Sequence, residues 1–343
     1  MGLLVWLRLR RRNYFDSPTL LDHILSSPLV FIASLLYRLI LLLRGSAFHP
    51  PRDKPAIRVV CISDTHSRPV AVPPGDILIH AGDLTDDGSA AAIQHQLDWL
   101  KTLPHGVKIV IAGNHDSFFD IRSRSADDVS SHAVLNLDGL TYLEDRLVVP
   151  EIKGRRIAIF GAPHIPECGP RSFAFQYTPL TQPWLSKVPP QTDILVTHGP
   201  PVALPFLLSS SPVPVPLVKL VKHHGDLGLG CPHLLREVWR VRPRLHVFGH
   251  IHCGYGSESA FFDDLQLAYE RLLSRPRRGL CGDLVPSQAW VDFVAIFFHG
   301  LHSLLWKWLM GGPGSNNGSI MVNAAQMYKN TGKVCSRAIV VDI

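Results

Sequence analysis

The sequence predicts a layered α/β fold with a functional site at one edge of its sheets. From residue 57 onward, short apolar runs rich in β-branched residues alternate with stretches of helical pattern, for example Ala90–Leu103 and Cys231–Val241. Such runs are typical of buried strands, and their alternation with helices is typical of α/β layers. Five of the runs end abruptly in Asp, Asn or His beside Gly. Because ligands of α/β proteins gather at the carboxyl ends of strands, we expect these polar residues to form the site.

The first of these runs, Val59–Ile62, is followed by Ser63-Asp64-Thr65-His66. Residues two apart on a strand point to the same side of the sheet. We therefore expect Asp64 and His66 to hold one ion together where the strand becomes a loop. Four later runs repeat this plan, and they occupy residues 77–83, 109–116, 194–199 and 246–252.

The polar residues at the five strand ends have the chemistry of a site for two metal ions. Carboxylate, amide oxygen and imidazole together suit Mn, Fe or Zn, and we assign Asp83 as the bridging carboxylate. With two ions about 3.5–4 Å apart, a bridging hydroxide forms near neutral pH and attacks phosphorus in line. His115, next to Asn114, is expected to donate a proton to the leaving alkoxide. The candidate ligands are Asp64, His66, Asp83, Asn114, His198, His250 and His252.

Each candidate ligand also has a purely structural explanation when it is considered alone. A single His after a buried strand is more often a hydrogen-bonded residue than a ligand, and Gly-Asp or Gly-Asn after a strand is usually turn chemistry. Seven such residues in a fixed order, each ending an apolar run, favour the metal site over coincidence.

Five motifs of the chain resemble those of the calcineurin-like metallophosphoesterase superfamily. Within it, the segments at residues 63–68, 79–83 and 242–250 resemble those of the metallophosphoesterase domain-containing proteins. The five motifs are Asp64-x-His66, Gly82-Asp83, Gly113-Asn114-His115-Asp116, His198-Gly199-Pro200-Pro201 and Gly249-His250-Ile251-His252. The resemblance covers about residues 57–257 and the last 25 residues. It implies a four-layer α/β/β/α sandwich of two mixed sheets. It also implies one ion held by Asp64, His66, Asp83 and His252, a second held by Asp83, Asn114, His198 and His250, and His115 as the acid.

The chain departs from the superfamily pattern just after the bridging residue. The Ser/Thr protein phosphatases that it resembles carry Asp-Arg-Gly there, whereas this chain has Asp86-Asp87-Gly88. A phosphate-clamping Arg is therefore missing, which argues against protein phosphatase activity. Arg68, two residues after His66, is a candidate substrate-binding residue, and an exposed loop Arg is the alternative interpretation.

Residues 1–55 form a basic tail with an apolar helix, distinct from a metallophosphoesterase domain over residues 56–343. They carry +5 of the formal net charge of +6, so a uniform basic face for nucleic acid is not expected. Residues 20–43 are apolar over about the length of a membrane span, with Pro28 and Arg38 as interruptions. Three interpretations remain open: a single span, a helix in the membrane interface, and a helix packed on the catalytic domain. The proline-rich segment 49–55 is the expected boundary.

Residues 257–318 look like an insertion. We expect a helix over Ala260–Leu273, a basic turn at residues 275–278 and a second, apolar helix over Trp290–Met310. Asp292 and Lys307 argue against a true span in the second helix. An interfacial helix over residues 290–310 and an amphipathic helix that covers the core are the two alternatives. A final pair of strands, Ser319–Ala324 and Ala338–Asp342, is expected to close the domain.

Two further features concern access to the site and cellular location. Leu204–Val221 contains several prolines and is expected to be a long apolar loop, a candidate lid or membrane-facing lip. The six cysteines lack a CxxC pair, which argues against a disulfide scaffold and favours a reducing compartment. We therefore expect a cytoplasmic protein, with membrane association possible through the N-terminal segment.

The leading hypothesis is a phosphoesterase that uses two metal ions to hydrolyse phosphodiesters, with a cyclic nucleotide or related small diester as substrate by resemblance. A membrane-associated hydrolase of lipid phosphoesters is a second hypothesis, because of the apolar additions. A metal-binding scaffold with vestigial activity is a third. The sequence does not specify the oligomeric state, the metal or the natural substrate.

Overall fold

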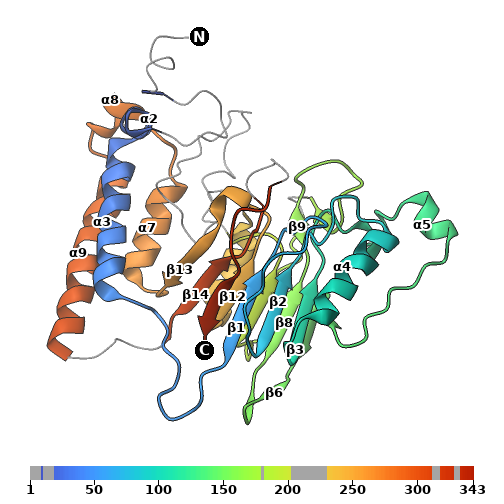
Figure 1. The fold of residues 1–343 in the computed structure, drawn as a ribbon. Coiled ribbons are helices and arrows are strands. Elements are labelled where there is room, and N and C mark those ends of the chain that lie inside the picture. Colours follow the sequence, from blue (N-terminus) through green and yellow to red (C-terminus); the bar gives the residue numbers. More distant parts are fainter. Residues whose placement is uncertain (1–8, 11–18, 179–180, 202–229, 311–316, 328–332) are drawn as a thin grey trace.

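The computed structural model describes residues 9–10, 19–178, 181–201, 230–310, 317–327 and 333–343. Two β-sheets lie at its centre, and a group of helices stands beside them (Figure 1). The Leu204–Val221 segment, for which we predicted a long apolar loop, lies outside the described residues. Most of the arginine cluster near the N-terminus lies outside them as well.

The first sheet has the strand order β15-β1-β2-β3-β4. Its middle strands are parallel, and only β15 runs antiparallel to its neighbour β1. The middle strands are almost continuously apolar because both faces of the sheet are covered. The bounds are β1 (Arg58–Ile62), β2 (Ile77–Ala81), β3 (Val107–Ile111), β4 (Thr141–Tyr142) and β15 (Ile339–Asp342).

The second sheet has the order β13-β14-β12-β11-β8-β5, with antiparallel strands at its two edges and parallel strands between them. Two short pairs, β6–β7 and β9–β10, lie outside the sheets. The bounds are β5 (Arg146–Val148), β6 (Glu151–Ile152), β7 (Arg155–Arg156), β8 (Ile159–Ala162), β9 (Ile165–Pro166), β10 (Gln176–Tyr177), β11 (Ile194–Thr197), β12 (Leu245–Phe248), β13 (Gly256–Ala260) and β14 (Ser319–Asn323).

The two mixed sheets face each other, and helices cover their outer faces. Alternate residues of β1 show this arrangement directly. Val59 belongs to the buried apolar cluster between the sheets, which includes Val247 of the second sheet. Val60 belongs to the outer cluster with α4 (Ala90–Thr102). On the far side, α6 (Pro232–Val241) covers the second sheet. The predicted α/β/β/α arrangement of two mixed sheets is confirmed.

A helical layer, by which we mean α3 (Pro28–Arg44), α7 (Asp264–Ser274) and α9 (Gln288–Met310), packs beside the second sheet (Figure 1). Tyr37 of α3 stacks on Tyr269 of α7 with ring centroids 4.0 Å apart, and Ile296 of α9 joins the same buried cluster. α7 also connects to the sandwich, since Trp239 Nε1 of α6 donates a hydrogen bond to Glu270. The N-terminal helix and the inserted helices therefore form one packed unit.

Three details differ from the sequence-based expectations. The two final strands, which we expected as a pair, lie in different sheets, β14 beside β12 and β13, and β15 beside β1. Residues 256–260, which we placed at the start of the insertion, form β13 and pair with β14, so the helical insertion begins after this strand. The apolar stretch that ends at residue 44 forms two helices, α2 (Leu20–Ser26) and α3, and the chain bends by 117° between them. The reason is that Ser27 is extended and caps α3, and Pro28 occupies the first helical position.

The remaining helical segments are short, and they are α5 (Ala126–Ser130), α8 (Gly279–Asp283) and single 3₁₀ turns at Ser117–Phe119 and His252–Gly254. Within the described residues, α9 is long and apolar enough to cross a membrane, and the bent pair α2–α3 passes the same criterion only if it is counted as one segment. Length and composition alone do not distinguish a span from a helix of another kind.

Candidate metal centre

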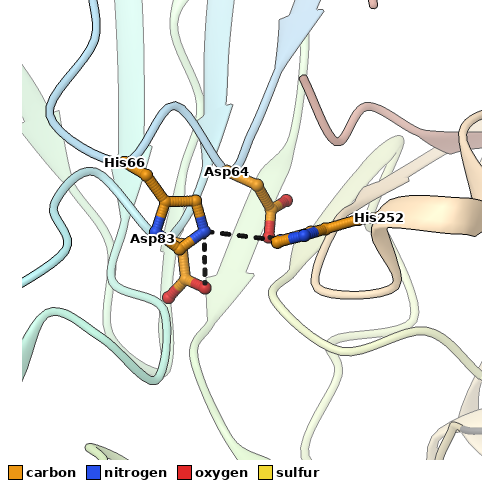
Figure 2. A group of neighbouring side chains, drawn as sticks. All are labelled: Asp64, His66, Asp83 and His252. Carbon is orange, nitrogen blue, oxygen red and sulfur yellow. Dashed lines mark hydrogen bonds and ion pairs between the residues drawn. The ribbon is translucent and has the colours of Figure 1, made fainter. Parts of the chain in front are cut away.

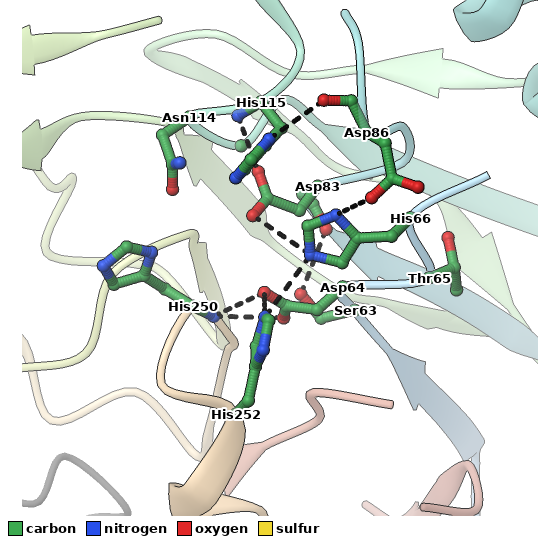
Figure 3. Close-up of polar contacts among 12 residues, drawn as sticks. Ser63, Asp64, Thr65, His66, Asp83, Asp86, Asn114, His115, His250 and His252 are labelled. Carbon is green, nitrogen blue, oxygen red and sulfur yellow. Dashed lines mark hydrogen bonds and ion pairs between the residues drawn. The ribbon is translucent and has the colours of Figure 1, made fainter. Parts of the chain in front are cut away.

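The predicted site residues converge where the two sheets meet, at the carboxyl ends of their parallel strands (Figure 3). The first sheet supplies the residues that follow β1, β2 and β3, and the second sheet supplies those that follow β11 and β12. The first set is Asp64, His66, Asp83, Asn114 and His115, and the second set is His198, His250 and His252. Topology therefore joins motifs that are as much as 188 positions apart, as are Asp64 and His252.

The backbone at this edge is unusual. Asp64, His66, Asp83 and His250 all have positive φ values between 47° and 63°. Non-glycine residues rarely adopt this left-handed region, and such strain is commonly retained at functional sites. Backbone hydrogen bonds hold the turns, from Asp64 N to Gly82 O and from His66 N to Asp83 O. Asp64 and His66 are therefore brought together by left-handed turns beyond the end of β1, not by the side-chain alternation of a strand that we had expected.

The first ligand group consists of Asp64, His66, Asp83 and His252 (Figure 2). One ligand atom from each lies within 4.8 Å of all the others. His252 Nε2 is 3.2 Å from Asp64 Oδ1, and His66 Nε2 is 3.7 Å from Asp83 Oδ2. His66 Nε2 and His252 Nε2 face each other at 3.3 Å, an arrangement that two imidazoles sustain only around a proton or a cation.

The second group consists of Asp83, His198 and His250, and it shares Asp83 with the first. His198 Nε2 is 3.4 Å from Asp83 Oδ1 and 3.0 Å from Asn114 Oδ1, so Asn114 joins this group. His198 Nδ1 donates to the carbonyl oxygen of Ala81 at 2.9 Å. Because a carbonyl only accepts, this bond leaves Nε2 as the ligand atom.

The electrostatics of the site favour cations. Burial raises the pKa of the Asp64 carboxyl, but the hydrogen bond and charge of His252 outweigh burial and hold that pKa at about 2. Burial acts on Asp83 in the same way, and His198 holds the pKa of that carboxyl well below its usual range. Conversely, burial lowers the pKa of His198, but Asp83 raises it to about 9. The buried carboxylates are thus ionised and surrounded by nitrogen donors.

His115 lies beside the shared carboxylate, with its backbone N–H donating to Asp83 Oδ1 at 2.8 Å. Its Nδ1 donates to the backbone oxygen of Asp86 at 3.1 Å, which fixes the tautomer and leaves Nε2 available (Figure 3). The ring also packs edge-on against the ring of His66, with centroids 5.0 Å apart. His115 is therefore held at the site but belongs to neither ligand group.

Asp86 is a residue whose role sequence reasoning missed. Its carboxylate is 3.1 Å from His66 Nδ1, and its backbone oxygen orients His115. The two groups are close enough for an ion pair, although His66 Nδ1 makes no hydrogen bond within the described residues and burial lowers the pKa of this imidazole. Arg68 Nη1 donates to the backbone oxygen of His66 at 2.6 Å and to Asp86 at 3.3 Å. In this structure Arg68 thus braces the loop that carries His66, and its predicted contact with substrate stays a prediction.

Two buried His–Thr pairs lie behind the ligands, one in each sheet, and sequence reasoning missed both. Thr65 Oγ1 is 2.9 Å from His80 Nε2, and Thr197 Oγ1 is 2.9 Å from His246 Nε2. Each Thr directly neighbours a ligand in sequence, and each His lies on the strand that leads to another ligand. The only sequence signal was a polar residue inside an otherwise apolar strand, which is costly unless it is hydrogen-bonded.

Asp116 connects the loops that follow β2 and β3. Its carboxylate accepts hydrogen bonds from the backbone N–H groups of Gly113, Leu84 and Thr85. Burial and the nearby Asp83 raise the pKa of Asp116 to about 6, and these backbone donors oppose the rise. Asp116 thus bridges both loops.

Close backbone packing at the site requires glycine at two positions. A Cβ at Gly113 would lie 2.2 Å from the backbone nitrogen and Oδ1 of Asp83. A Cβ at Gly249 would lie 2.1 Å from Asp64 Oδ2 and Ser63 Oγ. The two glycines let the β3 and β12 loops approach the carboxylates of the first sheet.

The donor set fits two ions of the Mn, Fe or Zn type, with Asp83 as the shared ligand. Two facing sheets that end in two ligand groups with one carboxylate in common have the arrangement of a centre for two metal ions. A family model described as calcineurin-like phosphoesterase matches residues 57–254. The chain belongs to this family, and the predicted membership is confirmed. All seven candidate ligands and His115 fall within the matched residues.

Several named proteins are similar to this chain. "Probable rhamnogalacturonate lyase C" of Emericella nidulans is 36% identical over 291 residues, which cover 84% of this chain and 24% of that protein. "Metallophosphoesterase domain-containing protein 1" of Homo sapiens is 38% identical over 236 residues, covering 60% of this chain and 65% of that protein. "UPF0046 protein K07C11.7" of Caenorhabditis elegans is 33% identical over 222 residues, covering 62% and 69%. The chain thus spans about a quarter of the Emericella protein and slightly under two thirds of the human protein.

Proposed function

We propose that this protein is a phosphodiesterase that uses two metal ions to hydrolyse a small diester, with a cyclic nucleotide as the model substrate. The observation that carries the proposal is the shared Asp83, which joins two ligand groups within reach of His115. Mn, Fe and Zn are all compatible with this mixture of carboxylate, amide and imidazole donors.

The chain's own residues account for positioning and proton transfer. Two bound ions would supply positive charge at the phosphoryl oxygens and activate a water for in-line attack. The Asp86 carbonyl accepts from His115 Nδ1, so the proton for the departing alkoxide would come from Nε2 of the doubly protonated ring. Asp86, behind His66, keeps that ligand's ring in place.

The charge around the site supports a diester over a monoester. A phosphomonoester carries about two negative charges at neutral pH and a diester carries one, so a monoester requires more positive charge from the protein. The chain has Asp86-Asp87 where a phosphate-clamping Arg stands in protein phosphatases. Arg68 directs its guanidinium to Asp86 and to a backbone oxygen. The rim of the site is therefore acidic and disfavours a dianion.

The test uses the purified full-length chain, its metal content by elemental analysis, and its turnover of phosphodiesters and monoesters with added Mn²⁺. We expect two ions per chain and a preference for diesters. Asp83→Asn, an isosteric change, should lose bound metal and at least about a hundredfold in turnover. His95→Ala removes an exposed His on α4 and serves as the matched control. A folded wild-type chain without bound metal would overturn the proposal.

The role of His115 is tested by the leaving group. His115→Ala should retain both ions and lose about a hundredfold or more on a cyclic nucleotide, whose leaving group is a basic alkoxide. It should lose much less on bis(p-nitrophenyl) phosphate, because p-nitrophenolate departs without protonation. Equal losses on both substrates would contradict a general-acid role.

A further inference from the structure

The outward side of α9 is apolar along the whole helix. Its exposed side chains recur at intervals of three or four residues, so they form one continuous stripe. The stripe comprises Val291, Val294, Phe298, Leu301, Leu305 and Trp308, each between 44% and 77% exposed. A surface helix of a water-soluble protein ordinarily presents polar residues on this side.

The charged residues of α9 point the other way, into the protein. Asp292 is buried and forms ion pairs with Arg271 and Arg275 near the end of α7. Lys307 Nζ donates to the carbonyl oxygens of Leu43 and Arg44, which end α3. The two charged side chains that argued against a span therefore have partners on neighbouring helices, Asp292 on α7 and Lys307 on α3. α9 is therefore apolar on two sides: Ala289 and Ile296 are buried against the other helices, Asp292 and Lys307 contact α7 and α3, and the outer stripe is exposed.

α3 repeats this pattern beside α9. Ile32, Leu35, Leu39 and Leu42 recur at helical spacing and are between 45% and 78% exposed. The two helices run parallel, because Asp283 accepts from the N-terminus of α3 just before α9 begins, and Lys307 caps the other end. They stand next to each other at the edge of the molecule away from the sandwich (Figure 1). We call the two exposed stripes together the α3–α9 face.

We propose that the α3–α9 face docks on a lipid bilayer and lies in the plane of one leaflet, with both helices submerged to the depth of their apolar stripes. Helices that bind membranes in this way combine a broad apolar face with basic charge and interfacial Trp. Trp290 lies near the start of α9, and Trp306 and Trp308 lie near its end. All three are at least 37% exposed.

Charge complementarity favours lipid headgroups as the occupant. α3 and α9 together contain one acidic residue, Asp292, and it is buried and paired. The exposed Arg38 lies beside the α3 stripe and offers it a positive charge, whereas Arg44 is paired with Asp263 and Lys307 caps α3. A groove of about 300 Å³ beside this end is lined in part by His299, His302 and Trp306. Interfaces with a protein partner ordinarily contain hydrogen bonds, and the apolar stripes offer few groups that could form them. Contact with the apolar part of a lipid leaflet requires no hydrogen bonds.

Packing along its length excludes α9 as a span in this arrangement. Asp292 is tied to α7 near one end and Lys307 to α3 near the other, and Gly300 lies between against Ile40. α7 is in turn hydrogen-bonded to α6 of the sandwich. A bilayer that enclosed α9 would also enclose α7 and the edge of the second sheet, whose polar groups have no place in hydrocarbon. If the bilayer contacts only the outer side of α9, the helix keeps its packing on α3 and α7, and the polar groups of the sheet stay out of the hydrocarbon.

The test is sedimentation of the purified full-length chain with vesicles of phosphatidylcholine containing a minority of phosphatidylserine. The wild-type chain should sediment with the vesicles. Phe298→Glu/Leu301→Glu should reduce binding by at least about tenfold, because two charges would enter the leaflet. Val134→Glu/Leu185→Glu is the matched control, since these apolar residues are 90% and 75% exposed elsewhere. The control should bind like the wild type, and all three proteins should hydrolyse a soluble diester equally.

Three results would overturn the proposal. The first is a wild-type chain that stays in the supernatant. The second is equal vesicle binding by the wild type and Phe298→Glu/Leu301→Glu. The third is a stable dimer in light scattering that this variant converts to a monomer, because the occupant would then be a second copy of the chain. Quenching of tryptophan fluorescence by lipids brominated at different depths tests orientation: quenching should be strongest for shallow labels, and a maximum at the bilayer centre would contradict in-plane docking.

Discussion

The β-sandwich and the helical layer place their polar side chains in opposite ways. Between the two sheets the interior is uniformly apolar, and the buried carboxylates and imidazoles are gathered at the strand ends. The helical layer also has a buried apolar cluster, but it holds the ion pair Asp292–Arg275 inside and exposes large apolar side chains on its outer side. The first arrangement suits a surface in water with a site that binds cations. The second suits contact with an apolar phase, so the two regions differ in the solvent that each is built for.

The largest expected effect comes from breaking the close approach of backbone and carboxylate at the metal centre. Gly113→Ala would place a methyl group 2.2 Å from Asp83 Oδ1, so the shared ligand must move. We expect at least about a hundredfold loss of diester turnover and reduced metal content, as for displaced ligands elsewhere. Gly106→Ala is the control, because a Cβ there meets only the carbonyl oxygen of Asp76 at 3.9 Å. Full activity in Gly113→Ala would contradict this geometry.

Metal removal should destabilise the sandwich more than the helical layer. Asp64 and Asp83 are buried and ionised, and bound cations offset their mutual repulsion. An ion at about 100 times its Kd stabilises a protein by about 2.7 kcal/mol. We therefore expect chelation to lower the Tm of the wild-type chain clearly and that of Asp83→Asn much less. Equal shifts in the two proteins would show that the chelator acts at another place.

The inward charges of the helical layer should matter for stability and not for catalysis. Asp292→Ala leaves Arg271 and Arg275 without their buried partner, and both arginines remain part-exposed. Because solvent screens the exposed arginines, we expect the free energy of unfolding in urea to fall by only about 2 kcal/mol. Diester turnover per folded chain should be unchanged. Asp138→Ala, an exposed control, should change stability by less than about 0.5 kcal/mol. No loss in Asp292→Ala would mean that these pairs do not hold α9 to α7.

The smallest effect is expected at the rim of the site. Arg68 pairs with Asp86 on the surface, where such pairs contribute at most about 1 kcal/mol. If Arg68 only braces the loop of His66, Arg68→Ala should lower kcat about threefold and leave KM unchanged. Steady-state kinetics distinguishes this from the contact with substrate predicted from the sequence. A raised KM with an unchanged kcat would favour the substrate contact.

The sequence was most informative where residue type alone carries the chemistry. Asp64, Asp83 and His198 could be proposed as ligands because each ends an apolar run, and parallel strands bring such ends to one edge. The sequence could not show how Asp64 and His66 meet, because left-handed turns at non-glycine residues have no reliable sequence signal. The His–Thr pairs were equally hidden, since each depends on a partner contributed by a neighbouring loop or strand.

The helical layer shows a different limit of sequence reasoning. Apolar residues occur on several sides of residues 288–310, so periodicity did not reveal which side faces the protein. The contacts that decide the matter join α3 to α9, segments far apart in the chain. Asp292 and Lys307 illustrate the consequence, because the side chains that argued against a span contact α7 and α3 and leave the outer side of α9 apolar.

The pairing of α3 with α7 and α9 also has a consequence for biosynthesis. Ribosomes add about 5–20 residues per second, so α3 emerges roughly 10–40 s before α7 is complete. During that interval the inner contacts of Tyr37 and Ile40 have no partner, and neither side of α3 is shielded from water. The nascent chain therefore exposes an apolar helix from early in translation.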